Sequence, residues 1–404
     1  MGETTALGNR LRTKRRENSL TQEELAHLSG VSQEMIAKTE QGRRQPRLTI
    51  LARLATALDI PLSELLDSRP RLGSARDGAS ILAIRNALLS PAQLPGTPLS
   101  STGQPVALPD LQETLTDAAR LYWAGDFAHL AAMLPELISQ AREAAESAGP
   151  PAHSILAQAY DLTAMLMVHM GKEDLAALSA ERAVTAALAS NDETLHALLE
   201  GTYAWVLLHQ GRLAEAEQLA AATADRIEPS FSAPATHVAA WGQLLITALG
   251  SAAAAGRDAG QYISLASAGA ERLGHPVQTY AGQSPFGKAS VAMQACHAYA
   301  VMREPEKALA AARTISPGQI QGILYGRHLL DVAQAHTDAR HGQAAATVLN
   351  QARSLSPVWF RHQEVARCLV ADLCEQQKHL SPALRELSAA VDPRWYAPYH
   401  RRTR

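Results

Sequence analysis

The side chains of this chain that could do chemistry do not stand in the spacings that catalysis or metal binding require. The chain has three cysteines, Cys296, Cys368 and Cys374. They are too few for a disulfide scaffold and include no Cys-x-x-Cys pair that could bind zinc. The histidines form no His-x-x-x-His pair. Glycine-rich phosphate loops, the Gly-x-Ser-x-Gly elbow and His-Glu-x-x-His are absent too. We therefore expect a protein that is not an enzyme, with no cofactor and no metal.

The distribution of charge separates a basic N-terminal end from an acidic remainder. The 404 residues contain 37 Lys/Arg and 39 Asp/Glu, for a net charge of −2. Residues 1–72 hold 12 basic and 9 acidic side chains, whereas the rest of the chain holds 25 and 30. This division is typical of a protein that binds a polyanion with one end only.

Helical signals at the N-terminal end predict a compact all-α domain of five short helices. Thr21 and Glu24 have the spacing of a capping box, which begins a helix that Gly30 ends. Ser32 is a good N-cap for the next helix, which should run to about Glu40. Two helices joined by a short turn that contains glycine match the helix-turn-helix arrangement. The other helices are expected near Leu7, over Leu48–Leu58 and over Pro61–Leu66.

The segment Thr21–Arg47, TQEELAHLSGVSQEMIAKTEQGRRQPR, closely resembles the Cro/repressor-like helix-turn-helix family, also called XRE. The resemblance covers about Leu7–Leu66, and it is carried by the Thr-Gln start, the Gly-Val-Ser turn, Ile36, the Glu-x-Gly end and the Leu-rich helix that follows. Two positions depart from the family: Arg47 replaces the usual Ser or Thr cap, and Asp59 replaces a frequent Gly or Asn. The resemblance implies a domain that binds double-stranded DNA.

The same resemblance implies a role for individual side chains. The third helix would read bases in the major groove, where Gln suits adenine, Glu accepts from cytosine and Lys donates to guanine. Arg15 and Glu40 would form an ion pair between the first and third helices. The base-reading residues would be Gln33, Glu34, Ala37 and Lys38. The phosphate-binding residues would be Thr21, Gln22, Arg43, Arg44 and Arg47.

Residues 69–110 differ in composition and are interpreted as a linker. They contain six prolines with several Gly and Ser, interrupted by one short helix over Ile81–Leu89. The expected divisions are a helix-turn-helix domain at 1–68, the linker at 69–110, a TPR-like ligand-sensing and dimerisation domain at 111–392, and a basic tail at 393–404.

From Leu111 onward the sequence repeats a helical hairpin. Each copy has a turn residue, with a small residue seven positions before it, a bulky one usually four before it, and a small or apolar residue five and nine after it. Small residues there let two antiparallel helices pack closely, and stacked pairs bury a shared face. The pattern is similar to the tetratricopeptide (TPR) repeat, with a period longer than the usual ~34 residues. The turn residues are Gly125, Gly171, Gly211, Gly256, Arg303 and Gly342, with a weaker last copy over Glu364–Leu387.

This order of domains resembles the peptide-sensing, quorum-sensing HTH/TPR regulators of Gram-positive bacteria. It is more similar still to actinobacterial XRE-type regulators with TPR-like C-terminal halves, through the segments Ser284–Gly287 and Leu329–Ala333. The resemblance implies a homodimer whose DNA binding is controlled by a ligand.

The first helix of each repeat would line the concave side of such an array. The repeat pattern places Trp, Met and His there with few charges, which suits an apolar peptide or a small molecule. The same spacing also fits a purely structural core between repeats. The predicted effector-binding residues are Asp161, Met165, His169, Thr202, Trp205, His209, Gln243, Met293, His297 and His336.

Together these patterns predict a homodimeric, sequence-specific transcriptional regulator whose binding to an operator is modulated by a peptide or a small signalling molecule. The alternative is a regulator whose TPR array docks a partner protein and takes no small effector. The uncharged stretch His237–Gly256 is long enough for a membrane helix, but its moderate hydropathy favours a buried helix with the start of its partner. We expect a cytoplasmic, nucleoid-associated protein without a membrane partner.

Overall fold

The computed structural model describes residues 3–18, 20–44, 46, 48–60, 65, 81–91, 106–316, 318–320, 322–361, 363–376 and 381–391. All the elements named in these ranges are α-helices, and their one pairing of extended backbone is an isolated antiparallel bridge between Val277 and Phe286. The prediction of an all-α chain is therefore confirmed. Among the described helices, none has both the length and the apolar composition needed to span a bilayer.

The N-terminal helices pack around a small apolar core that includes Leu11, Leu25 and Leu51. The predicted capping box is present, because Thr21 Oγ1 accepts from the Glu24 N–H at 3.1 Å and Glu24 Oε2 accepts from the Thr21 N–H at 2.6 Å. Of the fifth predicted helix, only a buried Leu65 belongs to the described residues. The helices are α1 (Glu3–Glu17), α2 (Gln22–Ser29), α3 (Gln33–Glu40) and α4 (Leu48–Ala57).

A buried ion pair joins α1 to α3. Arg15 donates from Nε and Nη2 to the two carboxylate oxygens of Glu40, at 2.6 and 2.9 Å, and Gln22 Nε2 adds a third hydrogen bond at 2.8 Å. Burial of the Glu40 carboxyl raises its pKa, but the hydrogen bonds from Arg15 and Gln22 lower it by more, so that the pKa lies below its usual value. The ion pair that the resemblance implied is confirmed.

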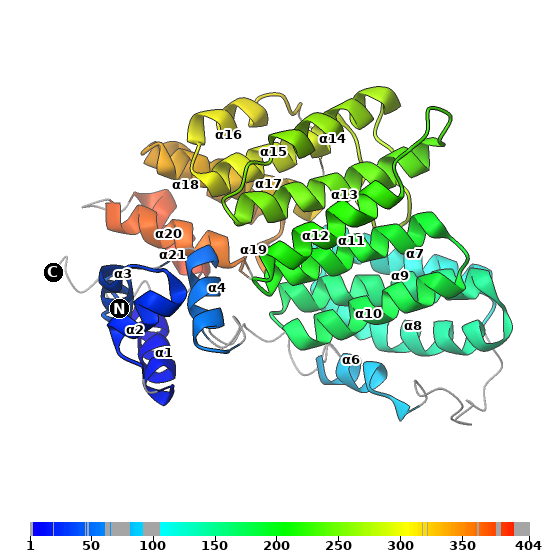
Figure 1. Cartoon of the computed structure of the whole chain (residues 1–404), viewed down its shortest axis with the longest axis horizontal. Coiled ribbons are helices and arrows are strands. Elements are labelled where there is room, and N and C mark those ends of the chain that lie inside the picture. Colours follow the sequence, from blue (N-terminus) through cyan, green and yellow to red (C-terminus); the bar gives the residue numbers. More distant parts are fainter. Residues whose placement is uncertain are drawn as a thin grey trace.

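From α7 to α21 the described residues form a stack of antiparallel helical hairpins beside the N-terminal domain (Figure 1). The short α6 packs on this stack through Ile84 and Leu88. The helices are α6 (Ile81–Leu88), α7 (Leu108–Ala124), α8 (Phe127–Ser147), α9 (Pro150–His169), α10 (Glu173–Ala189), α11 (Glu193–His209), α12 (Leu213–Arg226), α13 (Ala235–Ala254), α14 (Gly260–Leu273), α15 (Lys288–Met302), α16 (Pro305–Ala312), α17 (Gly322–Asp338), α18 (Gly342–Leu355), α19 (Pro357–Arg361), α20 (Glu364–Gln376) and α21 (Pro382–Val391).

In the α9–α10 and α11–α12 hairpins, the alanines that the repeat pattern places between paired helices are fully buried, whereas Ala312 of α16 is half-buried. Ala176 and Ala180 of α10 are 0 % exposed, as are Ala216 and Ala220 of α12. A small side chain at these positions lets α9 and α10, and α11 and α12, approach closely along their length. The helical-hairpin repeat predicted from the sequence is therefore present.

Five of the six predicted turn residues have the left-handed backbone that ends a helix: Gly125, Gly171, Gly211, Gly256 and Arg303, with φ between 62° and 80°.

The prediction of Gly342 as the sixth turn residue is wrong. The left-handed residue is Arg340, with φ 61°, and Gly342 is the first residue of α18. Gly342 was predicted as the turn residue because glycine adopts a left-handed backbone with the least strain. Here an arginine adopts that conformation, as Arg303 does one repeat earlier.

The uncharged stretch His237–Gly256 lies almost entirely in the single helix α13, and α14 begins only at Gly260. The prediction of a buried helix holds, but the stretch does not contain the start of the partner helix. Of the expected linker, the described residues include only 81–91 and 106–110, and the basic tail 393–404 lies outside them, so the domain boundaries stay predictions.

Loss of the Arg15–Glu40 pair should loosen α3. We expect Arg15→Ala to lower the opening free energy of the α3 amides by about 3 kcal/mol, because it leaves a buried carboxylate without its cation. Hydrogen–deuterium exchange of the full chain measures this, with the exposed Arg16→Ala as the matched control. Equal exchange in α3 for both variants would show that the pair does not hold the domain together.

Candidate DNA interface and effector cavity

The predicted base-reading residues lie on α3. Ser32 caps this helix, since its hydroxyl accepts from the Met35 N–H. Gln33, Glu34 and Lys38 are exposed, and Ala37 is half-buried. Lys38 Nζ lies 2.7 Å from Glu34 Oε1, one turn earlier, and the hydrogen bond from Lys38 holds the pKa of Glu34 below its usual value. Both side chains have to leave this exposed pair to reach a base edge, which costs little in water.

The predicted phosphate-binding residues differ in whether their side chains are already engaged in contacts within the domain. Thr21 is occupied by the capping box, and the Gln22 side chain donates to Glu40. Arg43 and Arg44 are exposed directly after α3. Their backbone N–H groups both donate to the carbonyl of residue 38, which fixes the loop, and the fifth residue, Arg47, lies outside the described residues.

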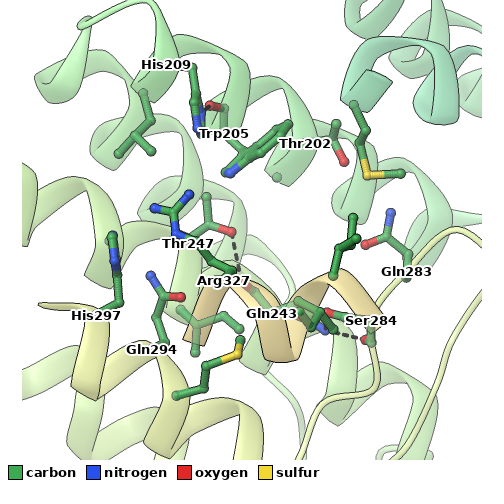
Figure 2. Close-up of a pocket in the computed structure, with 18 of the residues that line it drawn as sticks. Thr202, Trp205, His209, Gln243, Thr247, Gln283, Ser284, Gln294, His297 and Arg327 are labelled. Atoms are coloured by element: carbon green, nitrogen blue, oxygen red, sulfur yellow. Dashed lines mark hydrogen bonds between the residues drawn. The ribbon is translucent and has the colours of Figure 1, made fainter. Parts of the chain in front are cut away.

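A cavity of about 240 Å³ lies among the hairpins of the body (Figure 2). Its volume is slightly below the ~300 Å³ at which ligand pockets usually begin. Side chains from α7, α9, α11, α13, α15, α17 and α19 line it, together with the loop 282–284. Eight of the ten predicted effector-binding residues line this cavity: Met165, His169, Thr202, Trp205, His209, Gln243, Met293 and His297.

The other two predicted residues do not line the cavity. Asp161 is buried behind its wall, where Oδ2 accepts from Gln283 Nε2 at 2.9 Å. Burial raises the pKa of Asp161 to about 7, against hydrogen bonds from Thr202 and Gln283 that lower it. His336 is in the last turn of α17, whereas the cavity meets the first half of that helix.

The register of the lining explains where the sequence pattern failed. In α7 and α9 the lining residues sit in the last turns, as Trp123 and His169 show. In α17 they sit nearer the N-terminal end, at Leu324 and Arg327. Successive hairpins of a superhelical stack are rotated against each other, so one fixed offset from the turn cannot follow the cavity through every repeat. His336 was placed by such an offset.

One wall of the cavity is aromatic. The His169 ring stacks on Phe127 with centroids 5.0 Å apart, and its Nε2 lies 3.2 Å from the Tyr122 hydroxyl. Trp205 and His209 face each other at 4.3 Å between centroids, and His209 Nδ1 donates to the carbonyl of residue 205. These contacts fix the rings, so the wall offers flat, preformed apolar surface.

The opposite wall is polar. Gln243 Nε2 donates to the carbonyl and hydroxyl oxygens of Ser284, at 2.5 and 3.0 Å, which ties the loop after α14 to α13. His297 Nδ1 lies 2.9 Å from Asp331 Oδ1. Burial raises the pKa of Asp331, but the charge and hydrogen bond of His297 lower it by more, so that this carboxyl stays ionised. The sequence pattern did not select Ser284, which lies in a loop, or Arg327, because it considered at most three residues at fixed positions of each first helix.

The N-terminal domain touches the body at the end of a cavity helix. A Cβ added at Gly211 would lie 3.0 Å from Cβ of Ala52 on α4. Gly211 ends α11 two residues after His209, which lines the cavity. The turn after a cavity helix therefore contacts α4, which shares its apolar core with α3.

A second connection is electrostatic and involves α20. Burial raises the pKa of Asp372 to about 6, Glu375 acts in the same direction, and Arg303 and Arg44 oppose it. Arg44 also lowers the otherwise raised pKa of Glu375. A predicted phosphate-binding arginine thus lies close to acidic side chains of the body.

Comparisons with known proteins agree with this assignment of the N-terminal domain. A helix-turn-helix family model matches residues 11–65. An uncharacterized HTH-type transcriptional regulator, y4dJ of Sinorhizobium fredii, is 42% identical over 60 residues, which are 15% of this chain and 78% of that protein. The chain belongs to the helix-turn-helix family of transcriptional regulators, of the XRE type.

Solved structures resemble the chain only distantly. A PrgX mutant is 11% identical with a TM-score of 0.28, over 96% of this chain and 99% of that one. The competence regulator ComR of Streptococcus vestibularis, in its apo form, is 12% identical with a TM-score of 0.24, over 92% and 97%. At such TM-scores these likenesses bear on neither the cavity nor its ligand.

The two kinds of DNA contact predict different mutant behaviour. Gln33→Ala and Lys38→Ala should each cost roughly 1–3 kcal/mol of binding free energy on the cognate operator and relax base preference. Arg44→Ala should weaken binding to all sequences alike and reduce the salt slope by about 1. Titrations on operator and random DNA at several salt concentrations separate the two. Identical behaviour of the three variants on both DNAs would place the base-reading face elsewhere.

Proposed function

We propose that this transcriptional regulator binds its operator with an affinity that is set by an effector held in the cavity of the body. One observation carries the proposal: side chains from seven helices, spread over the hairpins from α7 to α19, line the same cavity. A ligand there would contact all these hairpins at once. The proposal assigns the chain no catalytic activity.

A ligand changes DNA affinity only if it binds two conformations of the protein unequally. Each hairpin of a stacked array contacts mainly its neighbours, so small rotations between hairpins add up along the stack. A cavity shared by several hairpins changes shape with those rotations. The effector would therefore favour one curvature of the body over another.

The contact between Ala52 and Gly211 gives this curvature a route to the DNA-binding domain. Movement of α11 shifts the turn on which α4 rests, and α4 packs against α2 in the small core beside α3. Release of Arg44 from the neighbourhood of Asp372 and Glu375 would free a cation for phosphate. The effector would act on DNA binding through these two connections.

We further propose that the protein acts as a homodimer, with residues 111–392 as the sensing and dimerisation part. Cro-like domains read half-sites about one helical turn apart, so two heads are needed for one palindromic operator. A change in the curvature of the body would then alter the spacing of the heads.

Capture of genomic DNA by the purified full-length protein tests the proposal. The capture is done alone, with whole cell extract, and with extract passed through a filter that retains proteins. We expect a palindromic motif whose occupancy changes with both extracts, because the effector is a small molecule or a short peptide.

Each other result contradicts a defined part of the proposal. A response to whole extract alone would show that the body binds a partner protein instead of a small effector. A motif that is indifferent to both extracts would remove the sensing role, and the absence of any motif would remove sequence-specific DNA binding.

A further inference from the structure

Arg327 is a half-buried arginine in the cavity wall without a direct partner. It forms no hydrogen bond or ion pair with any described residue. Figure 2 shows it reaching from α17 into the space bordered by Trp205, Gln294 and His297. A guanidinium carries five N–H donors and stays charged at any pH at which proteins are folded. Water accepts from such a half-buried group until a ligand acceptor of matching geometry replaces it.

The nearest negative charge is already engaged elsewhere. Asp331, one turn after Arg327, accepts from His297 Nδ1 at 2.9 Å. Arg327 helps to lower the pKa of Asp331 through space, without a hydrogen bond to it. Because the Asp331 carboxylate pairs with His297, the Arg327 guanidinium leaves at most a single positive charge to neutralise. The site therefore suits a monoanion better than a phosphate dianion.

A second donor without an acceptor belongs to Trp359, which also lines the cavity. Its indole N–H is buried and has no hydrogen-bond partner in the described part of the chain. The Trp359 ring packs on α17 at Gly326, next to Arg327, where an added Cβ would lie 2.6 Å from a ring carbon. Gly326 thus leaves room for the ring against the helix that carries the guanidinium. A buried donor of this kind is satisfied only when an acceptor reaches it.

The rest of the lining is largely apolar. Met165, Leu244, Ile246 and Met293 face the cavity along with the tryptophans. Thioether and indole groups fit apolar or aromatic bodies of variable shape.

We propose that the cavity binds a ligand with a carboxylate on an apolar or aromatic body, the carboxylate lying on the Arg327 guanidinium. A planar guanidinium matches the two oxygens of a carboxylate in a bidentate pair. This inference rests on the proposed function for the role of the cavity, and it names the chemical class of the effector. A small organic acid and the C-terminus of a short peptide share this chemistry.

Matched pairs of probes test the inference on the full-length protein. They are phenylacetate and phenylacetamide, octanoate and octanamide, and the peptide acetyl-Leu-Leu-Phe with a free or an amidated C-terminus. Calorimetry should show that at least one carboxylate binds about tenfold or more tightly than its amide. Preference for the small acids alone would identify a small organic acid, and preference for the free peptide alone would identify a peptide terminus.

The variants assign the preference to one side chain. Arg327→Gln keeps a polar donor but removes the charge, so it should lose the preference for carboxylate while circular dichroism stays unchanged. The exposed Arg313→Gln is the matched control and should keep it. Equal binding of all acids and amides to the wild type, or a preference that survives Arg327→Gln, would overturn the inference.

Operator titrations with the same probes separate this inference from the proposed function. A carboxylate that binds through Arg327 but leaves operator affinity unchanged would support the cavity chemistry and contradict the sensing role. Operator affinity that responds to filtered extract, together with no preference for any carboxylate, would support the sensing role and overturn the chemistry proposed here.

Discussion

Close packing of paired antiparallel helices at alanine is the constraint on which the body depends. Ala176 and Ala216 are fully buried between paired helices. A larger side chain at either position would push the two helices of the hairpin apart. Successive hairpins of such a stack are rotated against each other, and the first helices of the hairpins line the cavity. Bulky Trp, Met and His side chains fill its edges but leave about 240 Å³ between them.

The N-terminal domain depends on a different interaction. The Arg15–Glu40 pair, with Gln22 as a further donor, fixes α1, α2 and α3 relative to one another. It leaves α3 with an exposed face of polar side chains, while Ile36 is buried on the other side. The contact of Ala52 with Gly211 then joins this domain to the stack of hairpins whose curvature we propose the effector changes.

Local signals in the sequence predicted most of this fold because the caps and the small residues act within a few positions. The capping box at Thr21, the turn at Gly211 and the buried alanines follow from such short-range rules. The turn before Gly342 could not be predicted in this way, because its left-handed residue is Arg340, a residue type that does not mark such a turn in the sequence. Arg327 lies outside the fixed positions of the repeat and Ser284 lies in a loop, so no local pattern records that both line the cavity.

The central claim is that the cavity controls DNA binding, and filling it tests that claim most directly. Thr247 lines the cavity, whereas Thr347 is exposed on α18, and both hydroxyls bond the carbonyl four residues earlier at 3.0 Å. Operator affinity of the Thr247→Phe and Thr347→Phe proteins would be measured with and without filtered extract. The account predicts that Thr247→Phe loses a response of about fivefold or more that Thr347→Phe retains. A full response in a folded Thr247→Phe protein would contradict it.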